Sequence, residues 1–442
     1  MSEIGTTPRA LNVPSGRISR LARLGSMTTG VVGNMAVSGL REVVRGNRPA
    51  FQDLLLTPGN VRRIADDLAR MRGAAMKIGQ LLSMDTGDIL PPELSEIMAR
   101  LRADADYMPP KQLKVVLNKN WGQNWLRNFA SFDVRPLAAA SIGQVHRATT
   151  RDGRDMAIKV QYPGVARSID SDVANVGALV KVSGLIPQGF ELQPYLDEAR
   201  RQLHQEADYE REGRCLQDFR HLLQGDETFI LPELYNDYTT NNVLAMSFVE
   251  SRPIEDAGHL PQDRRNWIVE RLVELLFREL FEFGLMQTDP NYANYRFDLE
   301  SDRIVLLDFG ATRAFSTKVV EQYRGLFQAG LAGDTDRLRN AALEIGFMVP
   351  ETALRHQEAI VGMIEMVFAA VRDQPEFDFA DTTLSQKMND AGSALAADGF
   401  VPPPVPTDVL YLQRKFGGTF LLANRLKAKL AVREMIARYA ST

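Results

Sequence analysis

Two short segments in the C-terminal half of the chain restrict its fold more than any other feature. Asp289 and Asn294 are five residues apart in QTDPNYAN, and Asp308 follows four apolar residues in IVLLDFG. Alone, each segment is also typical of an ordinary turn, either Asp-Pro-Asn with a capping Asn or Asp-x-Gly at a strand end. Together, in this order, they predict a phosphate site in which Asp308 and Asn294 hold Mg²⁺ and Asp289 orients or deprotonates the nucleophile.

A lysine at the end of an upstream apolar strand, Lys159 in MAIKV, has the character of a phosphate ligand. Such a lysine is often only a solvated edge residue, but in phosphoryl transfer it reaches the α- and β-phosphates and pairs with a glutamate on a helix. We expect one helix over Pro194–Leu223. Its inward face carries two carboxylates in line with an apolar stripe: Asp208, Glu212, Cys215, Phe219 and Leu222. A buried carboxylate needs a cationic partner, so we predict that Glu212 pairs with Lys159.

Two further segments are expected to contact a nucleotide. The segment before Lys159 stands where a glycine-rich loop would cover phosphates, but it carries three alanines and a serine: Ala138, Ala139, Ala140 and Ser141. Alanine restricts φ where glycine allows close approach, so we expect a stiffer loop with altered phosphate geometry. The run VLAMSFVES fits a hinge strand, with Met246 at the back of an adenine pocket and backbone groups offered by the next three residues: Ser247, Phe248 and Val249.

The helix RGAAMKIGQLLSMD is small or apolar on nearly every side, which predicts that it is buried all round. Lys77 and Gln80 share one of its faces. A lysine in that position needs an acidic partner, and Glu206 or Asp208 is available. A core helix with a snorkelling lysine is the alternative interpretation.

Composition limits the other classes of function. The 442 residues are 45% hydrophobic and 24% charged, with a net charge of −4, which gives no general reason to expect nucleic acid. A single cysteine, Cys215, excludes a disulfide framework, and the five histidines lack metal-ligand spacing. No apolar run reaches about 20 residues, because Glu365 interrupts the best candidate, IVGMIEMVFAAV. We therefore expect a soluble or peripheral protein.

The N-terminus has no acidic residue between Glu3 and Glu42 but several arginines: Arg9, Arg17, Arg20, Arg23 and Arg41. This pattern fits a frayed basic tail or a transit-peptide-like segment. It equally fits a peripheral element attracted to anionic lipid.

Changes in pattern divide the chain into three expected domains. Residues 1–107 form a helical extension. Residues 108–249 combine strands over Ala140–Ala148 and Met156–Val160 with a helix from about Asp170 to Leu185. Residues 250–442 are mostly helical, apart from two short strands in NYRFDLESDRIVLLDFG.

In order, the segments follow a protein-kinase-like plan, although no His-Arg precedes Asp289 and no A-P-E follows DFG. A helical pattern resumes within about ten residues of DFG, which leaves no room for a long peptide-docking segment. The motifs KIGQ (77–80), AAASIGQVH (138–146), AIKV (157–160), EADYERE (206–212), QTDPNYAN (287–294) and LLDFGATR (306–313) resemble those of the UbiB or aarF-domain (ABC1-type) atypical kinase-like family, which supports ubiquinone biosynthesis. TDPNxxN and the C-terminal LQRKFGGTFLLANRLKAKL resemble the branch with mitochondrial members and bacterial relatives.

The resemblance implies an α+β fold, a bilobal atypical protein kinase whose KxGQ helix lies over the active site. It implies that Lys77 pairs with Glu206, with Gln80 and Asp208 as further gating residues. It also implies ATP or ADP with Mg²⁺ or Mn²⁺, and ATP hydrolysis in preference to protein phosphorylation. Gly213, after Glu212, departs from the family pattern and weakens the helix locally.

The expected function is that of an ATPase or small-molecule kinase acting on or with lipid-like quinone precursors at a membrane. A nucleotide-gated scaffold or lipid-extraction factor with incidental turnover stays open, as does a protein kinase. The expected partners are nucleotide, anionic membrane lipid, quinone-biosynthesis proteins and a second copy of the chain, with no nucleic acid. The expected location is the cytoplasmic face of a bacterial inner membrane or the matrix face in a mitochondrion.

Overall fold

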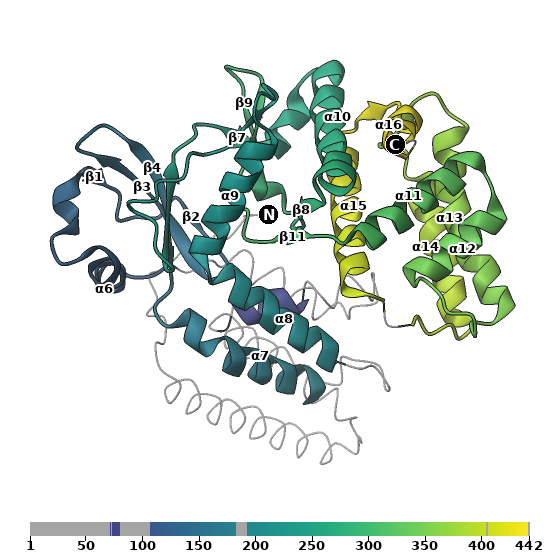
Figure 1. Cartoon of the computed structure of the whole chain (residues 1–442), viewed down its shortest axis with the longest axis horizontal. Helices are drawn as coiled ribbons and strands as arrows, with labels where there is room; N and C mark the ends of the chain where they lie inside the picture. Colours follow the sequence, from purple (N-terminus) through teal and green to yellow (C-terminus); the bar gives the residue numbers. More distant parts are fainter. Residues whose placement is uncertain (1–70, 72, 80–106, 183–191, 404, 441–442) are drawn as a thin grey trace, which may run out of the picture. The chain divides into compact units, whose positions relative to one another are not determined.

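The computed structural model describes residues 71, 73–79, 107–182, 192–403 and 405–440 (Figure 1). The chain divides into two compact units. Unit 1 comprises residues 1–217 and 233–248, and unit 2 comprises residues 218–232 and 249–442. Gln80 and the arginine-bearing N-terminus lie outside the described residues, so the predictions made for them are untested.

Unit 1 contains a five-stranded antiparallel sheet. Its strand order is β1 (Phe129–Phe132), β3 (Gly143–Thr150), β4 (Asp155–Gln161) and β6 (Val243–Ser247), and the short β2 (Ala138–Ala139) pairs with β3. Alternate residues of β3 are buried, as the period of two along a strand requires. A turn at 151–153 joins β3 to β4, and Gly153 supplies its positive φ of 90°.

An aromatic cluster covers one part of this sheet. Helix α6 (Pro110–Trp121) and the 3₁₀ turn η2 (Trp125–Asn128) carry Trp121 and Trp125. The rings of Trp121 and Trp125 lie 5.5 and 5.8 Å from that of Phe129, in stacked and edge-on arrangements. Burying these rings fixes α6 on the sheet.

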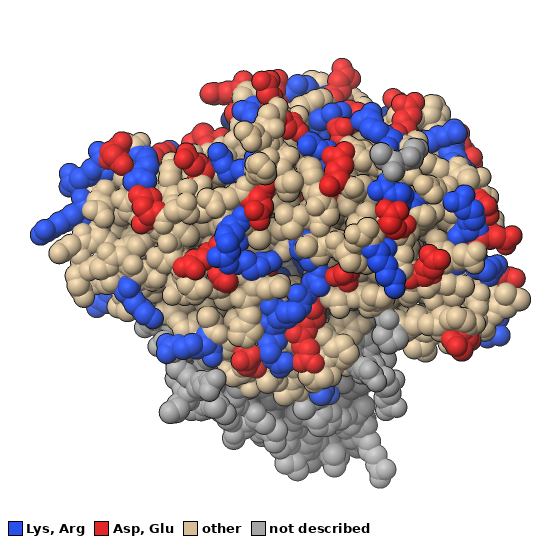
Figure 2. Space-filling model, in the orientation of Figure 1, with Lys and Arg blue, Asp and Glu red and all other residues tan. Residues whose placement is uncertain are grey.

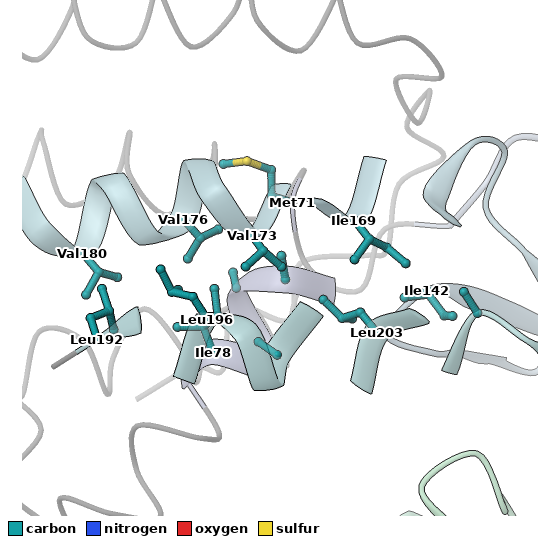
Figure 3. Close-up of a cluster of buried hydrophobic side chains, with 14 of the residues drawn as sticks. Met71, Ile78, Ile142, Ile169, Val173, Val176, Val180, Leu192, Leu196 and Leu203 are labelled. Carbon is teal, nitrogen blue, oxygen red and sulfur yellow. The ribbon is translucent and has the colours of Figure 1, made fainter. Parts of the chain in front are cut away.

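Among the described residues of unit 1, three further helices follow: α7 (Val165–Val182), α8 (Gln193–Glu206) and α9 (Tyr209–Leu222), the last of which passes into unit 2 after Gln217. Figure 1 shows α7 and α8 side by side. Their facing apolar side chains enclose the helical segment 73–79, and Figure 3 shows Ile78 among Val173, Leu196 and Leu203. The expected burial holds for most of the described residues of this segment, including Lys77 at 6% exposure, whereas Gly73 and Met76 are half-buried.

The prediction of one helix over Pro194–Leu223 is wrong, because the chain breaks at Ala207–Asp208. Gln161 donates its side-chain amide to the carbonyl of Ala207 at 2.7 Å, and Tyr209 N–H bonds to the carbonyl of Asn241. Asp208 accepts the backbone N–H of Arg211 at 2.9 Å and so caps α9. Tertiary hydrogen bonds therefore satisfy the backbone at the break, and Asp208 does not continue an inward-pointing face.

Unit 2 is mainly helical, as expected. Its helices are α10 (Gln262–Arg278), α11 (Thr317–Ala332), α12 (Thr335–Ile345), α13 (Leu354–Arg372), α14 (Thr383–Ala397), α15 (Thr407–Arg425) and α16 (Val432–Ala440). The α10 helix continues into a π-helical turn, η4 (Glu279–Phe283), which Gly284 ends with a φ of 59°. In Figure 1 helix α11 packs among α12, α13 and α16.

Short strands position the loops of unit 2. The two predicted strands are β9 (Tyr295–Asp298) and β10 (Arg303–Leu306), and β5 (Phe229–Ile230) and β7 (Arg252–Pro253) extend their sheet. Two further pairs join β8 (Leu285–Gln287) to β11 (Thr312–Ala314) and β12 (Phe377–Asp378) to β13 (Lys429–Leu430). Helix α11 begins at Thr317, so a helix does resume within ten residues of Gly310.

Among the described helices, none has the length and apolar character that crossing a bilayer requires. On the face drawn in Figure 2, basic and acidic side chains of the described residues are interspersed.

Candidate active site

The predicted ion pair between Lys159 of β4 and Glu212 of α9 is confirmed. The Lys159 ammonium lies 3.0 and 3.1 Å from the two carboxylate oxygens of Glu212, and the two side chains are 9% and 3% exposed. The same ammonium lies 5.3 Å from the ring centre of Tyr209, a cation–π distance. The pair thus presents a fixed cation in unit 1, and its role toward phosphates stays a prediction.

Lys77 forms its predicted ion pair with Glu206, at the C-terminal end of α8. Glu206 also accepts a hydrogen bond from the hydroxyl of Ser141 at 3.1 Å. Gly73 contacts the same loop, because a Cβ there would lie 3.0 Å from Ile142 Cγ2. These contacts connect the segment 73–79, α8 and the alanine segment. The sequence did not predict that Ser141 would bond to Glu206.

The alanine segment is a hydrogen-bonded hairpin. Ala138 and Ala139 pair with Val145 and Gln144 of β3, and Ala140 N–H donates to the carbonyl of Gly143 at 2.8 Å. Gly143 has no room for a side chain, since an added Cβ would lie 2.5 Å from the carbonyl oxygen of Val160. These contacts restrain the backbone of the segment, in keeping with the stiffness expected of it.

The hinge residues offer fewer donors than the sequence suggests. Ser247 N–H donates to the carbonyl of Glu233 at 2.8 Å, and Phe248 N–H donates to the carbonyl of Asp155 at 2.9 Å. Arg147 lies 3.9 Å above the Phe248 ring and forms two hydrogen bonds with the carboxylate of Asp155. Met246 is half-buried in β6. Two of the three predicted hinge amides are therefore already engaged within unit 1.

In unit 2, two strand pairs bring the candidate metal and catalytic residues together. Leu306 at the end of β10 pairs with Tyr295 at the start of β9, and Leu307 N–H donates to the carbonyl of Asn294 at 2.8 Å. Gln287 pairs with Thr312 across β8 and β11. These registers place the segment after β8, which holds Asp289, beside the segment before β11, which holds Asp308.

The side chains of this group fit a magnesium site. Asn294 donates its amide N–H to the carbonyl oxygen of Asp289 at 3.1 Å and lies 3.4 Å from its carboxylate, which leaves the amide oxygen of Asn294 as an acceptor. Asp308 supplies a carboxylate, and oxygen donors are what Mg²⁺ takes. The φ of Asp308 is +60°, a conformation that costs about 1–3 kcal/mol for a residue other than glycine and that clusters at functional sites. Within the described ranges, no three or more His, Cys, Asp or Glu side chains gather in a group that could hold a metal ion, and the candidate site combines two aspartates with an asparagine.

An aromatic contact supports the DFG segment. The ring of Phe309 lies 4.9 Å from that of Phe219, and both residues are buried. Phe219 belongs to the last turns of α9, within unit 2. The sequence predicted that Phe219 lies on the apolar stripe, but it did not predict the contact with Phe309.

The sequence analysis missed two basic residues of α15. Arg414 donates to the carboxylate of Asp289 at 2.6 Å, and the next residue, Lys415, forms an ion pair with Glu279 at 3.0 Å. Gly418 lets α15 approach this loop closely, since a Cβ there would lie 2.2 Å from Cβ of Pro290. Adjacent basic residues inside an apolar helix are a signal of buried charge, but their partners lie more than 120 residues earlier in the chain.

Comparison with known proteins places these residues in context. The model of the ABC1 atypical kinase-like domain matches residues 100–342. The mitochondrial atypical kinase COQ8 of Saccharomyces cerevisiae is 38% identical over 96% of this chain and 85% of its own. The mitochondrial atypical kinase COQ8B of Rattus norvegicus is 36% identical over 98% of this chain and 82% of its own. A solved complex of Rv3197 with erythromycin, from Mycobacterium tuberculosis, covers 86% of this chain and 95% of its own, with 22% identity and a TM-score of 0.61, and this likeness concerns the fold alone.

Proposed function

The chain belongs to the ABC1 atypical kinase-like family, and we propose that it hydrolyses ATP, or transfers the γ-phosphoryl group of ATP, in a Mg²⁺-dependent reaction. Its fold is the α+β kinase-like fold expected from the sequence. It is an enzyme of the atypical kinase or ATPase type. The observation that carries the proposal is the meeting of Asp289, Asn294 and the left-handed Asp308 on adjoining strand pairs. An oxygen-rich group of this kind suits phosphate-bound Mg²⁺.

In unit 1, Lys159 would contact the α- and β-phosphates, with Glu212 holding its ammonium in place. The hairpin Ala138–Ser141 would lie along the phosphates with little freedom to adapt. Met246 and the backbone of 247–249 would contact the adenine, chiefly through carbonyl groups, because the N–H groups of Ser247 and Phe248 already have partners.

In unit 2, Asp308 and Asn294 would hold Mg²⁺ or Mn²⁺, which supplies positive charge against the phosphate oxygens. Asp289 would orient the attacking hydroxyl or water and take up its proton. Arg414 fixes one oxygen of the Asp289 carboxylate, which leaves the other toward Asn294.

For the acceptor we favour water or a lipid-like quinone precursor over a polypeptide. The short connection from Gly310 to α11 leaves little chain for docking a peptide. The gating role of Lys77, Gln80, Glu206 and Asp208, implied by the family resemblance, is part of the proposal, as is the link to ubiquinone biosynthesis. The ion pair of Lys77 with Glu206 supports it, whereas the capping position of Asp208 does not.

ATP turnover in Asp308→Asn tests the reaction. Asp302→Asn is a matched control, because Asp302 also has a positive φ, of 56°, but pairs with Arg264 and lies outside the DFG segment. We expect Mg²⁺-dependent turnover to be lost in Asp308→Asn and kept in Asp302→Asn. Turnover that survives in Asp308→Asn would contradict the assignment. Full biological rescue by an inactive Asp308→Asn protein would favour the nucleotide-gated scaffold or lipid-extraction factor.

We further propose that the protein acts at an anionic membrane surface, through the arginines between Glu3 and Glu42. Each basic residue near such a surface contributes roughly 1 kcal/mol. The location would be the cytoplasmic face of a bacterial inner membrane or the mitochondrial matrix face, and the two COQ8 relatives named above are mitochondrial proteins. Co-sedimentation with anionic liposomes should fall when residues 1–30 are removed. Equal and salt-independent binding by both chains would defeat this part of the proposal.

A further inference from the structure

A buried ion pair of unit 2 contacts the backbone two residues before Asp289 of the candidate site. Lys415 of α15 and Glu279, the first residue of the π-helical turn η4, are 3% and 1% exposed, and their charged atoms are 3.0 Å apart. A buried ion pair is a weak source of stability, because an apolar pair of the same size often serves the fold as well. The π-helical turn that carries Glu279 is a rare form that is frequent at functional sites.

The pair holds the backbone of a single residue from both sides. Lys415 donates to the carbonyl of Gln287 at 2.7 Å, and Glu279 accepts the N–H of Gln287 at 3.2 Å. The third contact of the Lys415 ammonium is the hydroxyl of Tyr295, at 3.0 Å. Tyr295 directly follows Asn294 in the chain, so both anchored residues adjoin the candidate site.

Gln287 passes this restraint on to Asp308. Its side-chain amide donates to the carbonyl of Asp308 at 3.2 Å, which helps to hold that residue in its left-handed conformation. In the H-R-D motif of protein kinases a histidine stands two residues before the catalytic aspartate. Here Gln287 stands two residues before Asp289, and its backbone is held by the nearby charge of Glu279 and the distant charge of Lys415.

We propose that Lys415 and Glu279 are positioning residues for the metal site, acting through the backbone of Gln287 on Asp308. This inference rests on the proposed function, in which Asp308 holds Mg²⁺. Residues that orient metal ligands through hydrogen bonds affect metal affinity by about 10–100-fold when they are replaced. Loss of the pair should therefore weaken the response to Mg²⁺ without removing nucleotide binding itself.

The test uses a double variant, Lys415→Met with Glu279→Met, which removes both charges together and leaves neither buried alone. The readout is the thermal shift produced by ADP, first in EDTA and then as Mg²⁺ is titrated. We expect the shift in EDTA to match that of the wild type and the half-saturating Mg²⁺ concentration to rise by about 10–100-fold. A matched control, Arg372→Met with Glu365→Met, removes a partly buried ion pair of α13 and should keep the wild-type Mg²⁺ requirement.

A second variant covers the case in which the double variant does not fold. Gln287→Met keeps the clamped backbone and removes only the bond to Asp308, and we expect the same rise in the Mg²⁺ requirement. Adding Gln287→Met to the double variant should raise the half-saturating Mg²⁺ concentration little further, because both changes interrupt the same series of contacts to Asp308. A folded double variant, or Gln287→Met, with the wild-type Mg²⁺ requirement would overturn the inference alone. A wild type that shows no Mg²⁺-dependent shift would contradict the proposed function and the inference with it.

Discussion

Unit 1 and unit 2 both bury charged side chains near their candidate functional groups, but they place them differently. In unit 1 the buried ion pair of Lys159 with Glu212 contains the proposed phosphate ligand itself. In unit 2 the buried pair of Lys415 with Glu279 touches no candidate ligand directly and holds the backbone of Gln287 instead. A charge that must meet a ligand can be found from a local motif. Lys415, which holds the backbone next to the motif, comes instead from the distant helix α15.

The first prediction concerns the ion pair of Lys77 with Glu206 in unit 1. Lys77→Ala leaves the half-buried Glu206 without its cation, and cutting one partner from a fully buried pair costs about 3–5 kcal/mol, which is the upper limit here. We expect a loss of up to that size in the free energy of unfolding by denaturant, together with altered nucleotide turnover. Lys77→Ala with Glu206→Gln should recover most of the stability. A single variant as stable and as active as the wild type would show that this pair neither stabilises nor gates.

The second prediction compares adjacent glycines in α15. Gly418 faces Pro290 with no room for a methyl group, whereas a Cβ on Gly417 meets nothing within 4 Å. Gly418→Ala should destabilise by about 1–3 kcal/mol through overpacking. Gly417→Ala should stabilise by up to about 1 kcal/mol through helix propensity. Thermal melting of both variants checks this, and equal effects would mean that α15 does not approach the loop closely.

The third prediction contrasts the pH dependence of the units. His146 is buried, accepts a bond from Gln144 and donates to the carbonyl of Asp133, and burial lowers its pKa below the ordinary 6.5. The unfolded chain therefore binds this proton first as pH falls, and stability declines below about pH 6.5 by at most about 1.4 kcal/mol per pH unit. For Lys415, burial alone would lower the pKa, but Glu279 and Tyr295 raise it above 10.5, so its contribution is lost only in strong base.

Unfolding free energies at pH 7.5 and 5.5 check this prediction in the wild type and in His146→Gln. The wild type should lose more stability on acidification than the variant does. An identical loss in both proteins would assign the acid sensitivity to other groups.

The fourth prediction concerns the alanine hairpin of unit 1. Ala139→Gly frees the backbone of a residue that pairs with Gln144, at a cost of about 0.5–1 kcal/mol in stability. We expect a changed preference between ATP and ADP, measured by calorimetric titration of each nucleotide. If the variant binds both nucleotides as the wild type does, the hairpin lies away from the phosphates.

The sequence predicts the direct contacts better than their supports. Lys159 and Glu212 could be paired because helical spacing and an apolar strand each placed a charge in the interior. The inward-facing position expected of Asp208 was wrong because spacing assumes a continuous helix. Gln161 donates to the carbonyl of Ala207, and the carbonyl of Asn241 accepts the N–H of Tyr209, so α8 ends before Asp208. Tertiary contacts of this kind leave no periodic signal.

Short strands and long sequence separations explain which other contacts of the site the sequence did not predict. The strands β8 and β11, which place Asp289 beside Asp308, have three residues each, too few for an alternating pattern. Arg414 and Lys415 appear in the sequence as ordinary basic residues of an apolar helix. Their partners are set by the packing of α15 on α10 and on the loop at Pro290, which no local pattern records.

The effect of Mg²⁺ on nucleotide binding, with and without the Asp308 carboxylate, tests the candidate metal site most directly. Calorimetric titration of ADP into the wild type, Asp308→Asn and Asp302→Asn, each with Mg²⁺ and with EDTA, measures that effect. We predict that Mg²⁺ tightens ADP binding to the wild type and to Asp302→Asn but leaves binding to Asp308→Asn unchanged. Equal tightening by Mg²⁺ in Asp308→Asn would contradict the assignment of this group as the metal site.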